Sequence, residues 1–413
     1  MTVPASAFRP SLPRLALVLS LLLVASAPMG CARRPPAREE GSLPFVFRSL
    51  NLRQQDLLGR PAWELTSPEA RYDLSRRVAQ ALRPRGVIYA GGKPLYRLSA
   101  QSGTVLNDGE VILLEGAIRL EKLGPQAVLI RASRVRWIPQ KELMEIDRHP
   151  EAFDAQGRLL AQRARFRLDK NRLELRGSPQ LQRWSRPFDP LAPNPRGRPE
   201  LVVFVREMDW KPSTGLLETR GPVRAARHPE GSAPKRPPQT LTAARLEGNT
   251  LAQDYTLMGP VQLRDPAEAL SFEGSDLRVQ AKQNQLSSAR PFLARRGAAT
   301  ARGDSLLVRG GENSVEIPSS CWLEQPGESL QARRCRWNWT TQQIEAEGHL
   351  EIRRSASGQF IRGHLLQGRL GDQGQLKVTN PGGRVVSRFQ VPKRKGPAPT
   401  PAPPRRGPEP IRL

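Results

Sequence analysis

The chain has 413 residues and a formal net charge of +26, and only 5% of its residues are aromatic. It contains 34 glycines and 40 prolines. This composition argues against one dense globular core and suits many short strands joined by turns.

The chain begins with a segment typical of export. Arg9 and Arg14 precede an apolar run from Leu15 to Ala27. A basic start followed by a short apolar run is the pattern of a signal peptide, and the run is shorter than the roughly twenty residues that span a membrane. We therefore expect residues 1–30 to be a signal peptide.

Cys31 follows the apolar run directly after a small residue, Gly30. This order is similar to a bacterial lipoprotein cleavage site, so we expect Cys31 to carry a lipid anchor. Ordinary cleavage and a retained membrane anchor remain open as alternatives. In each case residues 31–43 would be a tether between membrane and folded body.

A repeat with a constant internal spacing fills most of the remaining chain. Five times, a small residue (once a valine) precedes a glycine by sixteen positions. The pairs are Ala100/Gly116, Ala161/Gly177, Val205/Gly221, Ala243/Gly259 and Ala332/Gly348. Apolar residues stand mostly two and four positions before and after each glycine, and polar residues stand between them. This period of two predicts a half-buried strand, and the glycine on its apolar face marks a bend or a close approach of another backbone.

The first half of each unit also has the pattern of a strand. After the small residue the apolar positions shift from even to odd offsets, as at Ala164 and Phe166 after Ala161, which predicts a bulge. Turn residues such as Asn107-Asp108-Gly109 separate the halves, so each unit is a β-hairpin. Weaker copies centre on Ala132, Gly274 and Gly303, and a partial copy follows Gly363. The sequence thus predicts an elongated all-β, antiparallel body of about 16–18 strands.

Two proline-rich inserts, Ser185–Glu200 and His228–Gln239, interrupt the repeat and are expected to be surface loops. We place the first part of the body at residues 44–184 and its continuation at 201–390. The basic, proline-rich residues 391–413 are expected to be disordered.

Cys321 and Cys335 both fall on inward positions of consecutive units. Neighbouring antiparallel strands can bring two such residues within bridging distance, and an exported protein meets an oxidising compartment. We expect a disulfide, with two buried free thiols as the alternative.

The charge does not predict a nucleic-acid-binding protein. Arg163, Arg165 and Arg167 alternate with apolar residues and would form a solvated outer face. Attraction to anionic lipid headgroups or acidic saccharides is the second interpretation. No signature of RNA or DNA binding occurs.

No pattern indicates catalysis. The four histidines are scattered without metal-ligand spacing, and there is no phosphate-binding glycine loop or nucleophile elbow. Acidic residues lie mainly on outward positions, whereas a glycosidase would need two facing carboxyl groups. We therefore expect no catalytic residue, no metal site and no cofactor.

Two segments carry a resemblance to a known family. Tyr96–Leu120, YRLSAQSGTVLNDGEVILLEGAIRL, resembles the repeat of the lipopolysaccharide-export periplasmic proteins, which include the LptC family and its relatives LptA/OstA. Leu52–Asp73, LRQQDLLGRPAWELTSPEARYD, looks like the start of an LptC domain. The Pro84–Gly92 connection resembles cyanobacterial members. The LptC-like part is residues 44–184, and looser OstA-like repeats continue over 201–390.

The resemblance implies a V-shaped jelly roll of two facing sheets, located in the periplasm and held at a membrane, more often the inner one. Implied partners are lipopolysaccharide, an inner-membrane lipopolysaccharide-export ABC transporter, and an LptA/OstA-like bridge or outer-membrane translocon. The interior would either fill as a core or stay open as a groove for acyl chains. The candidate groove residues are Ile112, Leu114, Ile118, Val135, Trp137, Phe166, Leu168, Leu173, Leu175 and Trp210.

Two other functions remain open. One is a structural scaffold of the cell envelope with a filled core, and the other is an enzyme on a β-solenoid that acts on polysaccharide. Inward carboxyl groups clustered on one wall would favour the enzyme.

Overall fold

The computed structural model describes residues 45–388, apart from 230–235, 356 and 370–374. These residues hold 36 β-strands and five 3-10 turns, and no α-helix occurs among them. All the strands belong to the second of two units into which the chain divides, Leu43–Leu413. The predicted signal peptide, the anchor residue Cys31, the tether and the 391–413 tail lie outside the described residues.

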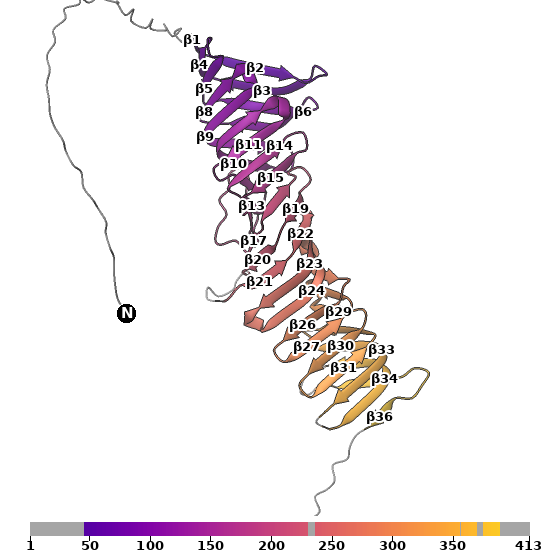
Figure 1. The fold of residues 1–413 in the computed structure, drawn as a ribbon. Helices are drawn as coiled ribbons and strands as arrows, with labels where there is room; N and C mark the ends of the chain where they lie inside the picture. The colour runs from indigo at the N-terminus through magenta and orange to yellow at the C-terminus, as the bar shows by residue number, and fades with distance from the viewer. Residues whose placement is uncertain (1–44, 230–235, 356, 370–374, 389–413) are drawn as a thin grey trace, which may run out of the picture. The chain divides into compact units, whose positions relative to one another are not determined.

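The strands form arms that cross the molecule and bend once (Figure 1). Six strands are long and run through the bend, and the other thirty come as fifteen pairs of short strands, one on each side of a bend. The described chain therefore has 21 arms, each antiparallel to the next. The prediction of an antiparallel all-β body is confirmed, but the expected 16–18 strands are too few. The bend divides most arms into two strands, and residues 45–90 add arms that lack the glycine repeat.

The short strands build two hydrogen-bonded ladders, which we call wall 1 and wall 2. Wall 1 contains β1 (Phe45–Phe47), β4 (Glu69–Asp73), β5 (Val78–Leu82), β8 (Ser102–Leu106), β11 (Leu143–Asp147), β14 (Arg163–Arg167), β15 (Arg172–Arg176), β18 (Glu207–Trp210), β19 (Leu216–Arg220), β22 (Arg245–Asn249), β25 (Gln285–Ser288), β28 (Leu306–Arg309), β29 (Ser314–Ile317), β32 (Arg334–Asn338) and β35 (Leu376–Thr379).

Wall 2 is built from the other member of each pair. It contains β2 (Leu50–Gln55), β3 (Pro61–Ser67), β6 (Arg85–Ala90), β7 (Lys93–Ser99), β12 (Glu151–Phe153), β13 (Gly157–Leu160), β16 (Gln180–Arg183), β17 (Leu201–Phe204), β20 (Val223–Arg227), β21 (Gln239–Ala243), β26 (Phe292–Arg296), β27 (Ala299–Gly303), β30 (Cys321–Gln325), β31 (Glu328–Ala332) and β36 (Val386–Arg388).

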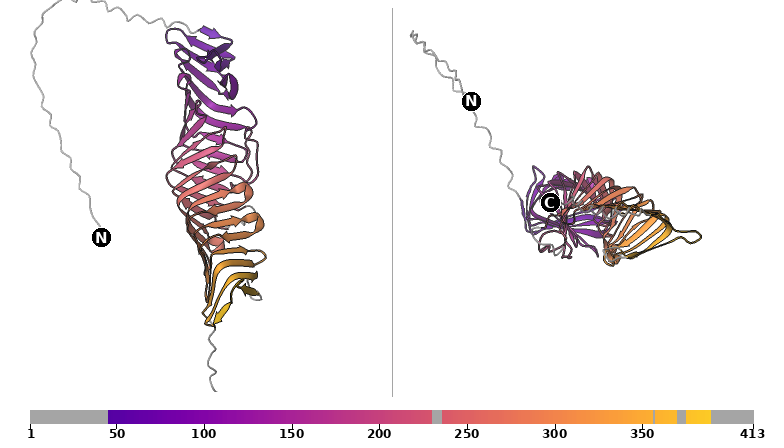
Figure 2. Two further views of the ribbon diagram at one scale, coloured as in Figure 1. Left: turned by 90° about the vertical axis from the view of Figure 1, so that its right-hand side faces the viewer. Right: turned by 90° about the horizontal axis from the view of Figure 1, so that it is seen from below.

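The six long strands belong to both walls and join them. They are β9 (Val111–Lys122), β10 (Val128–Ile138), β23 (Asp254–Asp265), β24 (Leu270–Gln280), β33 (Gln343–Arg354) and β34 (Gln359–Arg369). The 3-10 turns are η1 (Asn107–Gly109), η2 (Pro139–Lys141), η3 (Pro266–Glu268), η4 (Ala281–Gln283) and η5 (Gly310–Glu312). Figure 2 shows the stack of arms from two other directions.

The repeated glycine forms the bend. All five repeat glycines have φ between 74° and 80°, a left-handed conformation that favours glycine. At Gly116 the carbonyl accepts a hydrogen bond of 2.9 Å from the Gln101 backbone N–H, and a Cβ added to the glycine would lie 2.2 Å from the Gln101 side chain. In each of the other four units, the residue one position after the small residue likewise lies against the glycine. Two neighbouring arms are hydrogen-bonded to each other and bend side by side. The small residue lies at the first bend and the glycine at the second, and this arrangement explains the spacing of sixteen residues.

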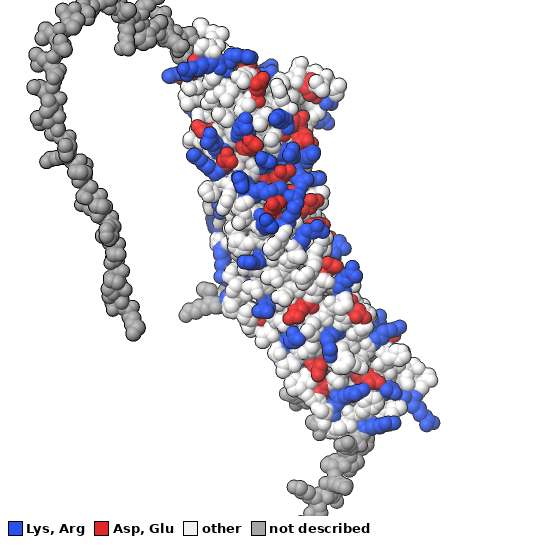
Figure 3. All heavy atoms as spheres, viewed as in Figure 1, with Lys and Arg blue, Asp and Glu red and all other residues white. Residues whose placement is uncertain are grey.

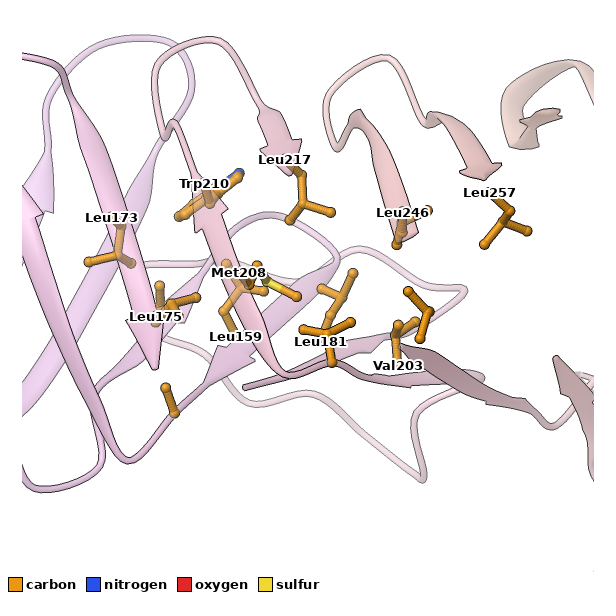
Figure 4. Close-up of a cluster of buried hydrophobic side chains, with 14 of the residues drawn as sticks. Leu159, Leu173, Leu175, Leu181, Val203, Met208, Trp210, Leu217, Leu246 and Leu257 are labelled. Carbon is orange, nitrogen blue, oxygen red and sulfur yellow. The ribbon is translucent and has the colours of Figure 1, made fainter. Parts of the chain in front are cut away.

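Inward side chains from both walls fill the space between them. The predicted phase is confirmed, because Ile112, Leu114, Ile118 and Leu120 on β9 are all buried, on both sides of Gly116. Figure 4 shows side chains such as Leu173 and Trp210 of wall 1 facing Leu159 and Leu181 of wall 2. This shared core holds the two walls together.

The ladders continue across the 185–200 insert, because β16 pairs with β17 on one side of it and β15 pairs with β18 on the other. The insert is a loop, as expected, but it packs back onto the protein. Its Leu191 carbonyl accepts a 2.7 Å hydrogen bond from Arg119, and Pro190 is buried. The domain boundaries at 184 and 201 therefore fall within one continuous pair of ladders.

Candidate functional site: the interior between the walls

The ten predicted groove residues come together in the structure. Nine of them are at most 3% exposed and belong to the shared core, and Leu168 is partly buried beside it. All except Ile118 and Leu168 lie on the wall 1 part of their strands. Along residues 112–210 the interior is thus a packed core in this structure.

The two walls meet along one side at the bends, and on the opposite side their hairpin turns face each other. We call this second side the mouth. Near its N-terminal end, Trp63 of wall 2 reaches Trp137 of wall 1, with ring centroids 5.3 Å apart in an edge-to-face arrangement. Such aromatic pairs add about 0.5–1.5 kcal/mol beyond the area they bury. These two rings close the mouth at this level.

The next contact across the mouth is made by Tyr96 of wall 2. Its ring packs edge to face on Phe166 of wall 1 at 5.4 Å, and its hydroxyl accepts a 2.8 Å hydrogen bond from Asn171. Asn171 lies in the wall 1 turn after β14 and also accepts a hydrogen bond from the Ser213 backbone N–H. Burial raises the pKa of the Tyr96 hydroxyl, so it stays neutral at physiological pH.

A third set of contacts crosses the mouth further along. Gln156 lies in the wall 2 turn between β12 and β13, and its side-chain carbonyl accepts a 2.7 Å hydrogen bond from Gln253, in the wall 1 turn between β22 and β23. Arg183 of wall 2 donates to the same oxygen at 3.2 Å and to the Tyr255 hydroxyl of wall 1 at 3.4 Å.

Beyond these contacts, towards the C-terminal end, the two walls make fewer contacts across the mouth. In the described residues between 256 and 369, no hydrogen bond or ring contact joins the far ends of the two walls. Ten inward apolar residues near the mouth are only half-buried there and pack against the core, although Ile344 and Ile352 beside them are buried. The ten are Leu263, Val279, Leu286, Ala294, Ala301, Val308, Val315, Leu323, Trp337 and Ile361. Half of this half-exposed row lies on wall 1, as most of the ten predicted residues do, and the other half lies on wall 2.

Sequence reasoning placed several residues of this row on the inward face but did not select them as lining residues. It missed Gln156, Arg183 and Gln253, because nothing in a local pattern indicates that residues 97 positions apart face each other across the mouth. The period of two reports which side of a strand is inward, and it does not report how far apart the walls stand.

The outer faces carry mixed charge, as Figure 3 shows for one side. On wall 1, Asp209 is 5% exposed and accepts hydrogen bonds from Arg172, Arg176 and Arg220. Burial acts to raise the pKa of the Asp209 carboxyl, and the hydrogen bonds from Arg172 and Arg176 outweigh it, so the pKa lies below its ordinary value. Asp209 therefore stays ionised and offsets part of the positive charge of these three arginines.

Cys321 on β30 and Cys335 on β32 are joined by a disulfide, with their Cα atoms 5.9 Å apart. Both residues are buried. The bond links wall 2 to wall 1 in the part of the molecule with the half-exposed row.

Within the described ranges, no group of three or more His, Cys, Asp or Glu side chains is placed to hold a metal ion. The same residues contain no helix with the length and apolar content needed to cross a membrane.

The comparisons with known proteins give one family. Residues 14–178 match the sequence model of the LptC family, described as lipopolysaccharide-assembly, LptC-related. No curated protein matches the chain. Among solved structures, one similar chain is LptH from Pseudomonas aeruginosa, titled the LptA homologous periplasmic component of the lipopolysaccharide transport device. It has a TM-score of 0.22 and 12% identity, and the alignment covers 26% of this chain and 76% of that one. Residues 14–178 are therefore similar to the LptC-related lipopolysaccharide-assembly family.

Proposed function

We propose that this protein takes part in lipopolysaccharide export and holds the acyl chains of the glycolipid between its two walls. The sugar headgroup would stay in water outside the mouth. The observation that carries this proposal is the half-exposed row of inward apolar residues beyond Tyr255, which leaves part of its apolar surface accessible. The family match over residues 14–178 supports the same function.

The physical chemistry of such a site is simple. Each acyl methylene removed from water contributes about 0.8 kcal/mol, so a chain of methylenes binds without any specific polar contact. The site needs no reactive group. ATP would be hydrolysed elsewhere, by an inner-membrane ABC transporter that supplies the lipid. The ten predicted groove residues from Ile112 to Trp210 would extend the same path towards the N-terminal end.

The partners would bind at the free edges of the ladders. Among the described residues, β1 pairs only with β4 and β2 only with β3 at the N-terminal end, and β35 and β36 pair only with β34 at the other end. An unpaired strand edge is a template for another strand. We propose that the N-terminal edge meets a jelly-roll domain of the transporter and that the C-terminal edge meets an LptA/OstA-like bridge or the outer-membrane translocon.

The protein would be held at the periplasmic side of the inner membrane by a lipid on Cys31. Mass spectrometry of the mature N-terminus tests this part. A diacylated or triacylated peptide that begins at Cys31 is expected, and an unmodified N-terminus at Ala32 or upstream of Cys31 would exclude it.

Site-specific photo-crosslinking tests the lipid-binding function. A diazirine-bearing aliphatic residue at Val308, which faces inward, is expected to give a lipopolysaccharide adduct in cells with an active transporter. Leu307 is the matched control, because it is the next residue on β28 and faces the opposite side of wall 1.

Absence of an adduct at both Val308 and Phe166 would contradict lipid transport. That result would favour a structural envelope scaffold, which the packed core along residues 112–210 would also suit.

A further inference from the structure

We propose that Gln156, Arg183, Gln253 and Tyr255 form a clasp across the mouth that controls the access of acyl chains to the interior beneath it. This inference rests on the proposed lipid-binding function and adds a mobile element to it. The clasp lies where the packed part of the interior gives way to the half-exposed row.

The geometry of the clasp is that of a link between walls rather than a contact within one ladder. The Gln253 amide donates to the Gln156 side-chain carbonyl at 2.7 Å, and these turns are 97 residues apart in the chain. Arg183 lies at the end of β16 and reaches Gln156 on its own wall and Tyr255 on the other. The link is made by side chains alone, so it can open without breaking either ladder.

The wall 2 half of the clasp is held in place by the 185–200 insert and the residue before it. The Trp184 and Phe188 backbone N–H groups donate to the carbonyls of Gln156 and Ala155, at 3.0 Å and 2.8 Å. The Gln156 amide also donates to the Ser185 carbonyl at 3.2 Å. The insert thus holds the turn in place, and the side-chain carbonyl of Gln156 remains available to accept the hydrogen bond from Gln253.

Directly inside the clasp the core is closed. Leu159, Leu181 and Leu257 lie two or three residues inward from Gln156, Arg183 and Tyr255, and each is at most 5% exposed (Figure 4). A lipid whose headgroup projects from the mouth cannot pass this level while the two rows of turns are joined. Acyl chains therefore reach Leu181 only when the clasp opens.

A crosslinked double variant tests the clasp. The purified full-length protein carries Gln156→Cys and Gln253→Cys, together with a diazirine-bearing aliphatic residue at Leu181 or, separately, at Val308. A bifunctional maleimide locks the two new thiols, and a monofunctional maleimide serves as the unlocked control. Purified lipopolysaccharide is added directly, and adducts are measured after illumination.

We expect locking to lower the adduct at Leu181 at least tenfold and to leave the adduct at Val308 unchanged. Conversely, Gln253→Ala is expected to raise the Leu181 adduct roughly fivefold, the factor by which one hydrogen bond shifts an equilibrium. Gln283→Ala, in the next wall 1 turn, is the matched control and should change neither yield.

Equal Leu181 yields in the locked and unlocked proteins would overturn the clasp. The clasp would also be overturned if Gln253→Ala gave an adduct at Val308 and none at Leu181, because the interior around Leu181 would then be a permanent core. Absence of adducts at both positions in every form would instead contradict the lipid-binding function itself.

Discussion

Two regions of this protein share one architecture and differ in how their interior is filled. In residues 45–249, large side chains from the two walls meet, as Trp63 meets Trp137 and Tyr96 meets Phe166. In residues 256–369 many inward positions near the mouth, such as Ala301 and Val308, are only half-buried. The bends and ladders are the same in both regions. The two regions therefore differ in how deeply the inward side chains near the mouth are buried.

The largest expected effect comes from emptying the packed region. Phe166→Ala should lower the free energy of unfolding by about 3–5 kcal/mol, because a fully buried aromatic side chain leaves a cavity. Trp337→Ala should cost clearly less, although tryptophan is larger, because Trp337 is only half-buried. Urea unfolding of both variants measures the difference. Equal losses would contradict the comparison between the regions.

The disulfide stabilises only the second region. Replacing Cys321 and Cys335 by alanine should cost about 3 kcal/mol, the effect of freeing a loop of 14 residues. Hydrogen exchange should show the loss around β30 and β32 and not around β14. Non-reducing peptide mapping of the native protein should first find the two cysteines joined, and two thiols open to alkylation would refute the bond.

The bend should be sensitive to any side chain at the repeat glycine. Gly116→Ala is expected to cost about 2 kcal/mol, since it combines a left-handed backbone with a contact of 2.2 Å to Gln101. Gly124→Ala is the control, because Gly124 also has positive φ but nothing lies near its missing Cβ. If the two variants lose the same stability, the close approach to Gln101 contributes nothing.

Asp209 gives the packed region a dependence on pH. Asp209→Asn should cost about 1–2 kcal/mol at pH 7, because it leaves Arg172, Arg176 and Arg220 without their shared carboxylate. The pKa of Asp209 is lowered by folding, so its contribution is complete above the ordinary carboxyl value of about 4 and is lost as the pH falls through the lower folded value. Unfolding curves of the native protein and the variant should converge in acid. A constant difference down to pH 2 would exclude the carboxylate as the cause.

The smallest effect is expected where an inward residue is only half-buried. Ala301→Leu should change stability by less than about 0.5 kcal/mol, because Ala301 is not enclosed by the core. Ala164→Leu in the packed region should cost about 1–3 kcal/mol through overpacking. Thermal unfolding of the two variants measures how well each region tolerates a larger side chain.

The sequence by itself determined the repeat, the inward phase and the bends. A period of two and a fixed glycine spacing are local properties, so Gly116 and the inward residues of β9 are where the pattern predicts them. The resemblance of Tyr96–Leu120 and Leu52–Asp73 to the LptC family agrees with the family match.

Only the tertiary structure decided how deeply each stretch of the interior is buried. The candidate groove residues Phe166 and Trp210 lie in the packed region, while the half-exposed row lies further along, near Val308. That outcome depends on which side chains meet across the mouth, and on contacts such as Gln156 to Gln253 between turns far apart in the chain. Hydrophobic periodicity determines which face of each strand is buried. The distance between the two walls depends on the combined volume of the side chains that pack between them, so it cannot be read from one strand.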